Sequence, residues 1–252
     1  MLDCHIHLQH VEPLVRTQIL REANRLKMSC FFCNATGCND WQNVLDIAAE
    51  SGKVRPFLGV HPWFVDELPR DWEAQLASLL ETHPCGIGEI GLDKTPKGKD
   101  FALQTAVFLR QLELAVRLQR PVVLHCVQAW GPLMEIVRTE AFREVKMIFH
   151  SFNGSAEIAH ELMAAGRILS FSPRSLGQPA IRDILKKAPP AQFLLETDFP
   201  YLPGVALASA GLNDYRSGII GVYQMAAKLR GIDPARLGSM LEETGKRFLV
   251  HG

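Results

Sequence analysis

The sequence predicts a single α/β domain folded as a (β/α)8 TIM barrel. Short apolar segments, many rich in β-branched residues, alternate along the chain with longer amphipathic segments. Eight such short segments can be distinguished, and the length of 252 residues matches the roughly 250 residues that one barrel needs. No internal repeat, low-complexity tract or linker divides the sequence, so we expect one domain over residues 1–252.

Strands are predicted where apolar runs are short and nearly continuous, because the strands of a parallel barrel are covered on both faces. They are Leu2–His7, Ser29–Asn34, Val54–Val60, Gly86–Ile90, Val122–Cys126, Met147–His150, Ile168–Phe171 and Phe193–Thr197. Helices are predicted where the intervening segments are longer and amphipathic. They are Glu12–Lys27, Trp41–Ser51, Asp71–Thr82, Phe101–Gln119, Pro132–Thr139, Ser155–Ala165, Pro179–Lys187, Tyr215–Arg230 and Pro234–Phe248. The Pro-, Gly- and Ala-rich segment Pro200–Gly211 is predicted to be a loop at the barrel mouth.

A doubly wound open sheet is the alternative to a barrel. The segment Gly86-Ile-Gly88-Glu-Ile-Gly91 matches the GxGxxG pattern of dinucleotide-binding loops. In that motif the glycines open a helix whose N-terminus binds the pyrophosphate. Residues 92–98 intervene here before any predicted helix, which disfavours a nucleotide site.

Composition and charge limit the class of protein. Lys and Arg number 27 and so do Asp and Glu, while 47% of residues are hydrophobic. This indicates a globular protein without a strongly basic surface for nucleic acid. The N-terminus MLDCHIHLQH has no signal-peptide pattern, and no apolar run reaches the ~18 residues of a membrane span. Together with six scattered cysteines, interpreted as free thiols, this predicts a cytoplasmic protein with no membrane attachment and no obligate protein partner.

Side chains of metal-ligand type stand at the ends of most predicted strands. In parallel α/β folds the ligand site lies beyond the carboxyl ends of the strands. The residues found there are His5, His7, His61, Glu89, His125, His150 and Asp198. His5 and His7 are two apart on a strand and therefore face the same side. A barrel interior is otherwise filled by apolar side chains, so this ring of imidazoles and carboxylates predicts a bound cation at the C-terminal mouth.

The number of candidate ligands fits two divalent ions better than one. Glu89, at the fourth of eight strands, could bridge them, and Asp198 could bind one ion and also take the proton of the attacking water. Two ions acting on one water are suited to in-line hydrolysis of phosphate esters. The donor types leave zinc, manganese and magnesium open.

The order of these residues resembles the motif set of the TatD-type metal-dependent deoxyribonucleases. The matching segments are Asp3-Cys-His5-Ile-His7, Gly59-Val-His61-Pro62-Trp63, Gly88-Glu89-Ile-Gly91-Leu-Asp93, His125, His150-Ser-Phe152-Asn-Gly154-Ser and Glu196-Thr-Asp198-Phe-Pro200-Tyr-Leu202. The resemblance implies a TIM barrel of the metal-dependent hydrolase superfamily, with DNA or another phosphodiester bound at the barrel mouth. The metal ligands it implies are His5, His7, Glu89, His125, His150 and Asp198, and His61 is implied as a residue near the substrate.

The predicted substrate rim departs from the family pattern. Val127 stands where the family often has arginine, which removes one expected cationic contact. Arg174 and Trp63, in loops after predicted strands, are the candidate substrate contacts, and Arg174 suits phosphate because its guanidinium binds in a bidentate way. Lys94, Lys97 and Lys99 are further candidates.

Two other functions stay open from the sequence. One keeps the barrel and the metals but hydrolyses an amide or lactone in a small molecule, as related amidohydrolases do. Many of those place a carboxylated lysine at the fourth strand, where this chain has Glu89, so the phosphodiester hypothesis is favoured. The other is a binding or scaffold protein without activity, which the full set of candidate ligands disfavours.

Overall fold

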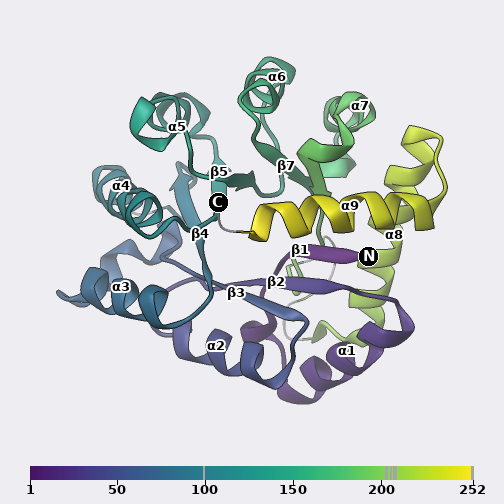
Figure 1. Cartoon of the computed structure of the whole chain (residues 1–252), viewed down its shortest axis with the longest axis horizontal. Coiled ribbons are helices and arrows are strands. Elements are labelled where there is room, and N and C mark those ends of the chain that lie inside the picture. Colours follow the sequence, from purple (N-terminus) through teal and green to yellow (C-terminus); the bar gives the residue numbers. More distant parts are fainter. Residues whose placement is uncertain (99, 202–203, 205, 207–208, 251–252) are drawn as a thin grey trace.

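The computed structural model describes residues 1–98, 100–201, 204, 206 and 209–250, and it confirms the barrel. Eight parallel strands pair in chain order, and helices surround them (Figure 1). The strands are β1 (Leu2–Ile6), β2 (Cys30–Asn34), β3 (Val54–Leu58), β4 (Gly86–Asp93), β5 (Val122–Val127), β6 (Met147–Phe149), β7 (Ile168–Phe171) and β8 (Phe193–Leu195). All eight predicted strands are present, so a doubly wound sheet is excluded.

The helices lie between and after the strands, as expected. They are α1 (Pro13–Arg25), α2 (Trp41–Glu50), α3 (Trp72–Thr82), α4 (Phe101–Leu118), α5 (Trp130–Val137), α6 (Ala156–Ala164), α7 (Pro179–Lys187), α8 (Leu212–Arg230) and α9 (Pro234–Leu249). None of these described helices is long and apolar enough to cross a bilayer. Residues 202–203, 205 and 207–208 of the predicted mouth loop, together with Lys99, lie outside the described residues.

Strand β4 is longer than predicted, and this corrects both its expected end and the expected position of Glu89. It continues through Gly91 to Asp93, pairing with β5 from Ile90 onward, so Glu89 lies within the strand instead of at its end. Gly91 makes the close pairing possible because its φ is +147° and it has no Cβ. The glycines at 86, 88 and 91 therefore belong to a strand and open no helix, which agrees with the expectation that this segment is not a dinucleotide-binding loop.

The barrel closes between β1 and the segment that follows β8. Asp3 takes part with its side chain: its carboxylate accepts hydrogen bonds from the Thr197 backbone N–H (3.0 Å) and from the Thr197 hydroxyl (2.7 Å). Beyond it the backbone pairs directly, since Asp198 N–H donates to His5 O (3.0 Å) and His7 N–H donates to Phe199 O (2.8 Å). This seam holds Asp198 beside the end of β1.

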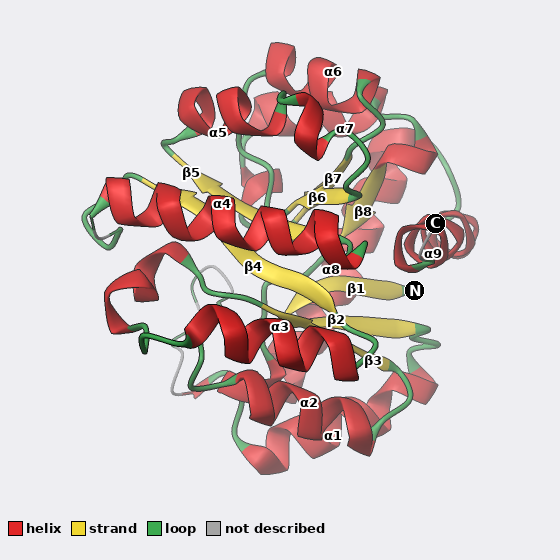
Figure 2. Ribbon diagram, turned by 60° about the vertical axis from the view of Figure 1, so that its left-hand side comes forward, coloured by secondary structure: helices red, strands yellow, loops and turns green. Residues whose placement is uncertain are grey.

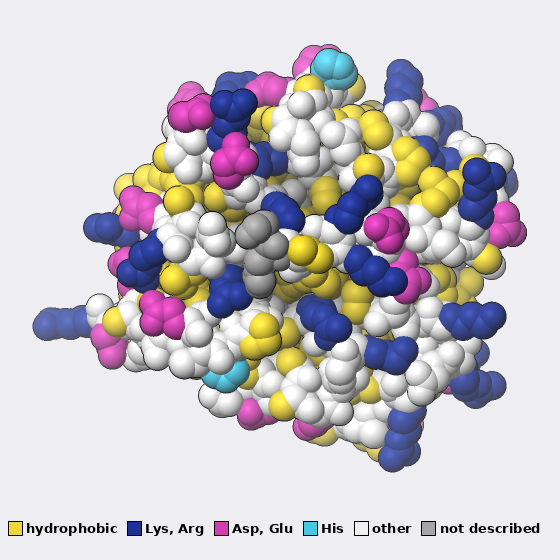
Figure 3. All heavy atoms as spheres, viewed as in Figure 1, with side chains coloured by type: hydrophobic (Ala, Val, Ile, Leu, Met, Phe, Trp, Pro, Cys, Tyr) yellow, Lys and Arg dark blue, Asp and Glu magenta, His cyan; other side chains and the backbone are white. Residues whose placement is uncertain are grey.

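The opposite end of the barrel, where the strands begin, is covered by α9. Figure 2 shows this helix beyond the start of β1, beside the N-terminus. Lys and Arg side chains are spread over this face (Figure 3). Several donate to backbone carbonyl groups, as Lys53 does to Met28 O, Arg120 to Leu80 O and Lys146 to Val250 O. Leu80 lies in the last turn of α3 and Val250 follows α9, so Arg120 and Lys146 compensate carbonyl oxygens that helix ends leave unpaired.

Replacing Gly91 is expected to destabilise the barrel strongly. In Gly91→Ala the new Cβ would lie 1.9 Å from the backbone oxygen of His125, which can move only if β5 moves. We expect a loss of about 3 kcal/mol in the free energy of unfolding, measured by urea denaturation followed by circular dichroism. The control is Gly221→Ala within α8, where a Cβ meets no atom within 4 Å and should stabilise the helix by up to about 1 kcal/mol. Equal unfolding midpoints for the two variants would contradict this account of β4.

Candidate metal centre

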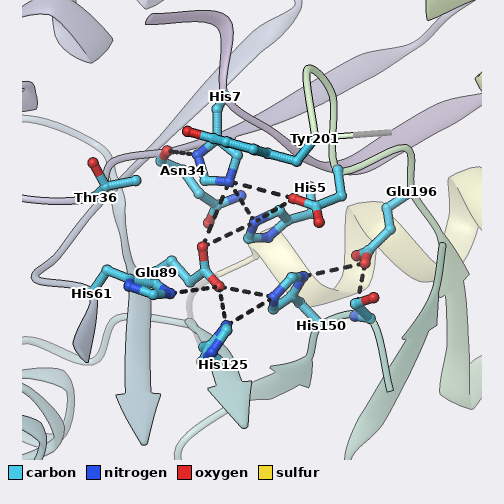
Figure 4. Close-up of polar contacts among 12 residues, drawn as sticks. His5, His7, Asn34, Thr36, His61, Glu89, His125, His150, Glu196 and Tyr201 are labelled. Atoms are coloured by element: carbon cyan, nitrogen blue, oxygen red, sulfur yellow. Dashed lines mark hydrogen bonds and ion pairs between the residues drawn. The ribbon is translucent and has the colours of Figure 1, made fainter. Parts of the chain in front are cut away.

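The residues predicted from the strand ends meet in one buried cluster at the carboxyl end of the barrel. The histidines His5, His7, His61, His125 and His150 and the carboxylate of Glu89 are all less than 9% exposed. The Asp198 side chain, 16% exposed, is the most accessible group of the cluster. Figure 4 shows the imidazoles of this cluster around Glu89.

Glu89 is the centre of the cluster. Its Oε1 lies 2.8 Å from His125 Nδ1 and 2.8 Å from His150 Nε2, while its Oε2 lies 3.2 Å from His5 Nε2 and 3.6 Å from His7 Nε2. Burial alone would raise the pKa of this carboxyl. The charge of His150 and the hydrogen bond of His125 outweigh burial and hold the pKa well below its usual range.

Three of the histidines are oriented by an acceptor on their outer ring nitrogen. The pairs are His7 Nδ1 with the backbone oxygen of Asn34 (2.8 Å), His125 Nε2 with Asp93 Oδ2 (3.1 Å) and His150 Nδ1 with Glu196 Oε1 (3.3 Å). Because these oxygens only accept, each outer nitrogen carries a proton. In the neutral imidazole, the inner nitrogen then presents its lone pair to the middle of the cluster, as in metal-binding histidines.

This arrangement requires positive charge among the inner nitrogens and carboxylates. The Nε2 atoms of His5 and His7 are only 3.1 Å apart, and the buried Nδ1 of His5 has no hydrogen-bond partner among the described residues. Three overlapping groups bring one ligand atom per residue within 4.8 Å of one another: His5, Glu89 and His150; His5, His7 and Asp198; and His61, Glu89 and His125. The donor set therefore fits metal ions, and protons would supply the charge without them.

Asp198 completes the cluster from the barrel seam. It follows β8 with φ +58°, a left-handed conformation that aspartate tolerates better than most residues. Its Oδ1 lies 3.6 Å from His7 Nε2 and 4.0 Å from His5 Nε2. Burial would raise its pKa, but the hydrogen bond with His7 and the charges of His150 and His5 lower it, so the group is a carboxylate.

His61 differs from the other histidines in its hydrogen bonding. Its Nδ1 accepts the backbone N–H of Trp63 (3.1 Å) at the start of the short 3-10 helix Pro62–Glu67. Burial and the charge of His125 hold the pKa of His61 well below its usual value, so the ring is neutral. Its proton is then on Nε2, which points into the cluster 3.7 Å from Glu89 Oε1. In this tautomer His61 Nε2–H is placed to donate a hydrogen bond into the cluster.

A cavity of about 660 Å³ opens above the cluster, and all three predicted substrate contacts line it. The Trp63 indole N–H donates to Asp93 Oδ2 (2.8 Å), and Lys97 Nζ lies 4.6 Å above the ring. Arg174 is exposed and donates to the backbone oxygen of Tyr201 (3.1 Å). Val127, which stands where the family often has arginine, also lines the cavity.

Sequence reasoning gave no role to the residues that orient the histidines. Asp93 and Glu196 stand inside the quoted motifs, and both are buried. The spacing of Glu196 could have indicated its position near the site. It is two residues before Asp198, and in an extended chain this spacing places two side chains on the same face. Asn34 acts through its backbone oxygen, which no sequence pattern reports.

Comparison with known proteins gives one family. A sequence model of the family described as "TatD related DNase" matches residues 2–249. The human deoxyribonuclease TATDN3 is 28% identical over 220 residues, covering 80% of this chain and 78% of its own length. The uncharacterized metal-dependent hydrolase YabD of Bacillus subtilis is 31% identical over 215 residues, covering 81% of this chain and 80% of its own length. The crystal structure of YJJV, a TatD homolog from Escherichia coli K12, superposes with a TM-score of 0.83 at 26% identity, covering 100% of this chain and 98% of its own.

Metal binding to the metal-free protein should release protons. Burial lowers the pKa of His150, but the carboxylates of Glu89 and Glu196 outweigh it and hold this pKa well above its usual value. The imidazole therefore carries a proton at pH 7 that an incoming ion must displace, and affinity should rise with pH until that raised pKa is passed. Titration calorimetry with manganese in two buffers of different ionisation enthalpy should show release of about one proton or more. His160→Ala, on the exposed side of α6, should behave like the wild type. Heats that do not depend on the buffer, with an affinity that does not depend on pH, would contradict this.

Proposed function

Because the chain belongs to the family of TatD-related DNases, we propose that it is a divalent-metal-dependent nuclease that hydrolyses phosphodiester bonds at the barrel mouth. The observation that carries this proposal is the convergence of four histidine nitrogens, three of them oriented by an acceptor, and two carboxylates beneath an open cavity. DNA is the proposed substrate class, since relatives such as TATDN3 are named deoxyribonucleases. The cytoplasmic location expected from the sequence stays a prediction.

We propose two ions at this site. One would be held by His5, His7 and Asp198, and the other by Glu89, His125 and His150, with Glu89 near enough to both groups to bridge them. Of the three ions left open by the sequence, zinc and manganese suit this histidine-rich donor set better than magnesium, which prefers oxygen ligands. When bound, such ions polarise a phosphate oxygen and lower the pKa of water.

Other roles are proposed for side chains of the cluster: accepting a proton, binding the phosphate and orienting the ligands. Asp198 is the carboxylate nearest to solvent and is proposed to accept the proton of the attacking water. His61 Nε2–H is proposed to donate to a non-bridging phosphate oxygen, because its other nitrogen is already occupied by Trp63 N–H. Asp93 and Glu196 keep His125 and His150 in the tautomers that present a lone pair.

Two rim residues are proposed to bind the substrate beyond the reacting phosphate. The Trp63 indole N–H is bound to Asp93, so the ring is held in place and can offer a face to a base. Arg174 can pair with a phosphate oxygen from the opposite side of the cavity. It would supply the cationic contact that Val127 cannot make.

The activity should depend on metal and on the ligand set. Wild-type protein treated with chelator and reloaded with manganese, magnesium or zinc should cleave single-stranded DNA with at least one of these ions. His125→Ala should lower kcat/KM at least a hundredfold while staying folded, because Glu89 and His150 lose a shared partner. His160→Ala serves as the matched control. The proposal fails if no ion supports cleavage by the wild type.

The same assay separates the amide or lactone alternative. A phosphodiesterase should hydrolyse nitrophenyl phosphodiesters and leave nitroanilides and lactones intact. The reverse preference would favour a small-molecule amidohydrolase on the same scaffold.

Arg174→Ala should weaken substrate binding more than catalysis. Arg174 lines the cavity but contacts no residue of the ligand cluster in the described structure, so KM for single-stranded DNA should rise about tenfold with kcat nearly unchanged. The dependence of KM on salt should also become weaker. Lys187→Ala, which removes the same charge from the end of α7 at the other side of the barrel, is the control. Equal effects of the two variants would contradict a specific contact.

A further inference from the structure

Three side chains in contact, Tyr201, His10 and Asp40, lie beside the metal-ligand cluster and are not among its candidate ligands. The Tyr201 hydroxyl lies 2.9 Å from His10 Nδ1, and His10 Nε2 lies 3.4 Å from Asp40 Oδ2. Tyr201 lines the same cavity as the cluster. Figure 4 shows it alongside His7, and the two rings meet edge to face at 5.4 Å.

Asp40 is fixed as an acceptor at the far end of this chain. Its carboxylate accepts hydrogen bonds from the Thr36 backbone N–H (2.9 Å), the Thr36 hydroxyl (2.9 Å), the Gly37 N–H (3.2 Å) and Gln9 Nε2 (3.1 Å). So many donors favour the ionised form. An ionised carboxylate has no proton to give, so the proton between Asp40 and His10 belongs to His10 Nε2.

The direction of the remaining hydrogen bond follows from this assignment. In a neutral imidazole with its proton on Nε2, Nδ1 is an acceptor. With His10 in this neutral form, the Tyr201 hydroxyl donates to His10 Nδ1. Burial and the nearby charge of Asp198 raise the pKa of Tyr201 to about 12, so the hydroxyl keeps this proton. Its oxygen is left with acceptor lone pairs, and within the described residues His10 is its hydrogen-bond partner.

Tyr201 is also held close to the reacting centre by its backbone. Its N–H donates to Asp198 O (2.7 Å), and its carbonyl oxygen accepts from Arg174 (3.1 Å). The backbone of Tyr201 is therefore fixed to Asp198, a proposed metal ligand, and to Arg174, the proposed phosphate contact. The hydroxyl is held as an acceptor near both residues.

We infer that Tyr201 accepts a hydrogen bond from a sugar hydroxyl of the bound nucleotide, and that His10 and Asp40 set it in this role. Phosphate oxygens only accept, so they cannot pair with an oxygen whose proton is already given away. The donors nearest to a phosphodiester are sugar hydroxyls, either the 3′-hydroxyl of a chain end or the 2′-hydroxyl of RNA. This selectivity rests on the proposed nuclease function, whereas the binding of a nucleotide sugar can be tested apart from it.

The test compares substrates that differ by one hydroxyl. The metal-loaded protein is given a DNA oligonucleotide with a 3′-hydroxyl end, the same oligonucleotide with a 2′,3′-dideoxy end, and RNA of the same sequence with 3′-hydroxyl and 3′-deoxy ends. We expect kcat/KM to fall about tenfold where the recognised hydroxyl is missing. A loss confined to the 3′-modified ends identifies the terminal hydroxyl, and a preference for RNA at either end identifies the 2′-hydroxyl.

Two variants assign the preference to this chain of residues. Tyr201→Phe keeps the ring against His7 and should abolish the preference. His10→Phe keeps a ring beside His7 but leaves the Tyr201 hydroxyl unoriented, so it should lose most of the preference, and the double variant should lose no more than Tyr201→Phe. A wild type without any preference, or a Tyr201→Phe protein that keeps it, overturns the inference.

A binding measurement separates this inference from the nuclease proposal. Calorimetry with AMP, dAMP and 2′,3′-dideoxy-AMP should show affinity about tenfold weaker without the recognised hydroxyl for the wild type, and equal affinities for Tyr201→Phe. If no nucleic acid is cleaved, the nuclease proposal fails and these affinities alone decide the role of Tyr201. Equal affinities of the wild type for all three nucleotides would overturn it.

Discussion

One buried carboxylate, that of Glu89, is the interaction on which the rest of the site depends. Its two oxygens lie within 3.6 Å of nitrogens from four histidines, which come from three different parts of the barrel. A charge in this position is costly unless it is paired. Acceptors behind three of the histidines turn the ring nitrogens toward it. The cluster is therefore arranged to be completed by cations, and the surrounding polar groups serve that arrangement.

The position of Asp198 in the cluster depends on the backbone contacts that close the barrel between β1 and the segment after β8. β8 has only three residues, and the segment that follows it is joined to β1 first by the bonds between Asp3 and Thr197 and then by backbone pairing from Asp198 to Phe199. Between these two sets of bonds the chain turns at Asp198, which has a left-handed conformation. The closure of the barrel at this point brings the candidate ligand Asp198, from the end of the barrel sequence, next to His5 and His7 from its beginning. Closing the barrel and assembling half of the site are thus the same event.

Most of the fold and the meeting of the candidate ligands at one end of the barrel could be predicted because both follow from local patterns. An apolar run marks a strand, and the residue at its carboxyl end must face the barrel mouth. The predicted end of β4 was wrong because pairing with β5 extends this strand through Gly91 to Asp93. The acceptors behind the histidines and the contact of Tyr201 with His10 join residues far apart in the chain. Such contacts depend on loop conformations, which the order of residue types does not report.

The position of α9 has a consequence for synthesis. All the proposed ligands precede this helix, yet α9 packs against β1 and β8, and Phe248 lies against Phe32 and Phe57 with ring centroids 6.0 and 6.2 Å apart. A growing polypeptide that has passed Asp198 but lacks α9 carries every ligand and leaves this apolar end of the barrel open to water. Docking of α9 therefore covers the apolar end of the barrel that lies opposite the candidate ligands.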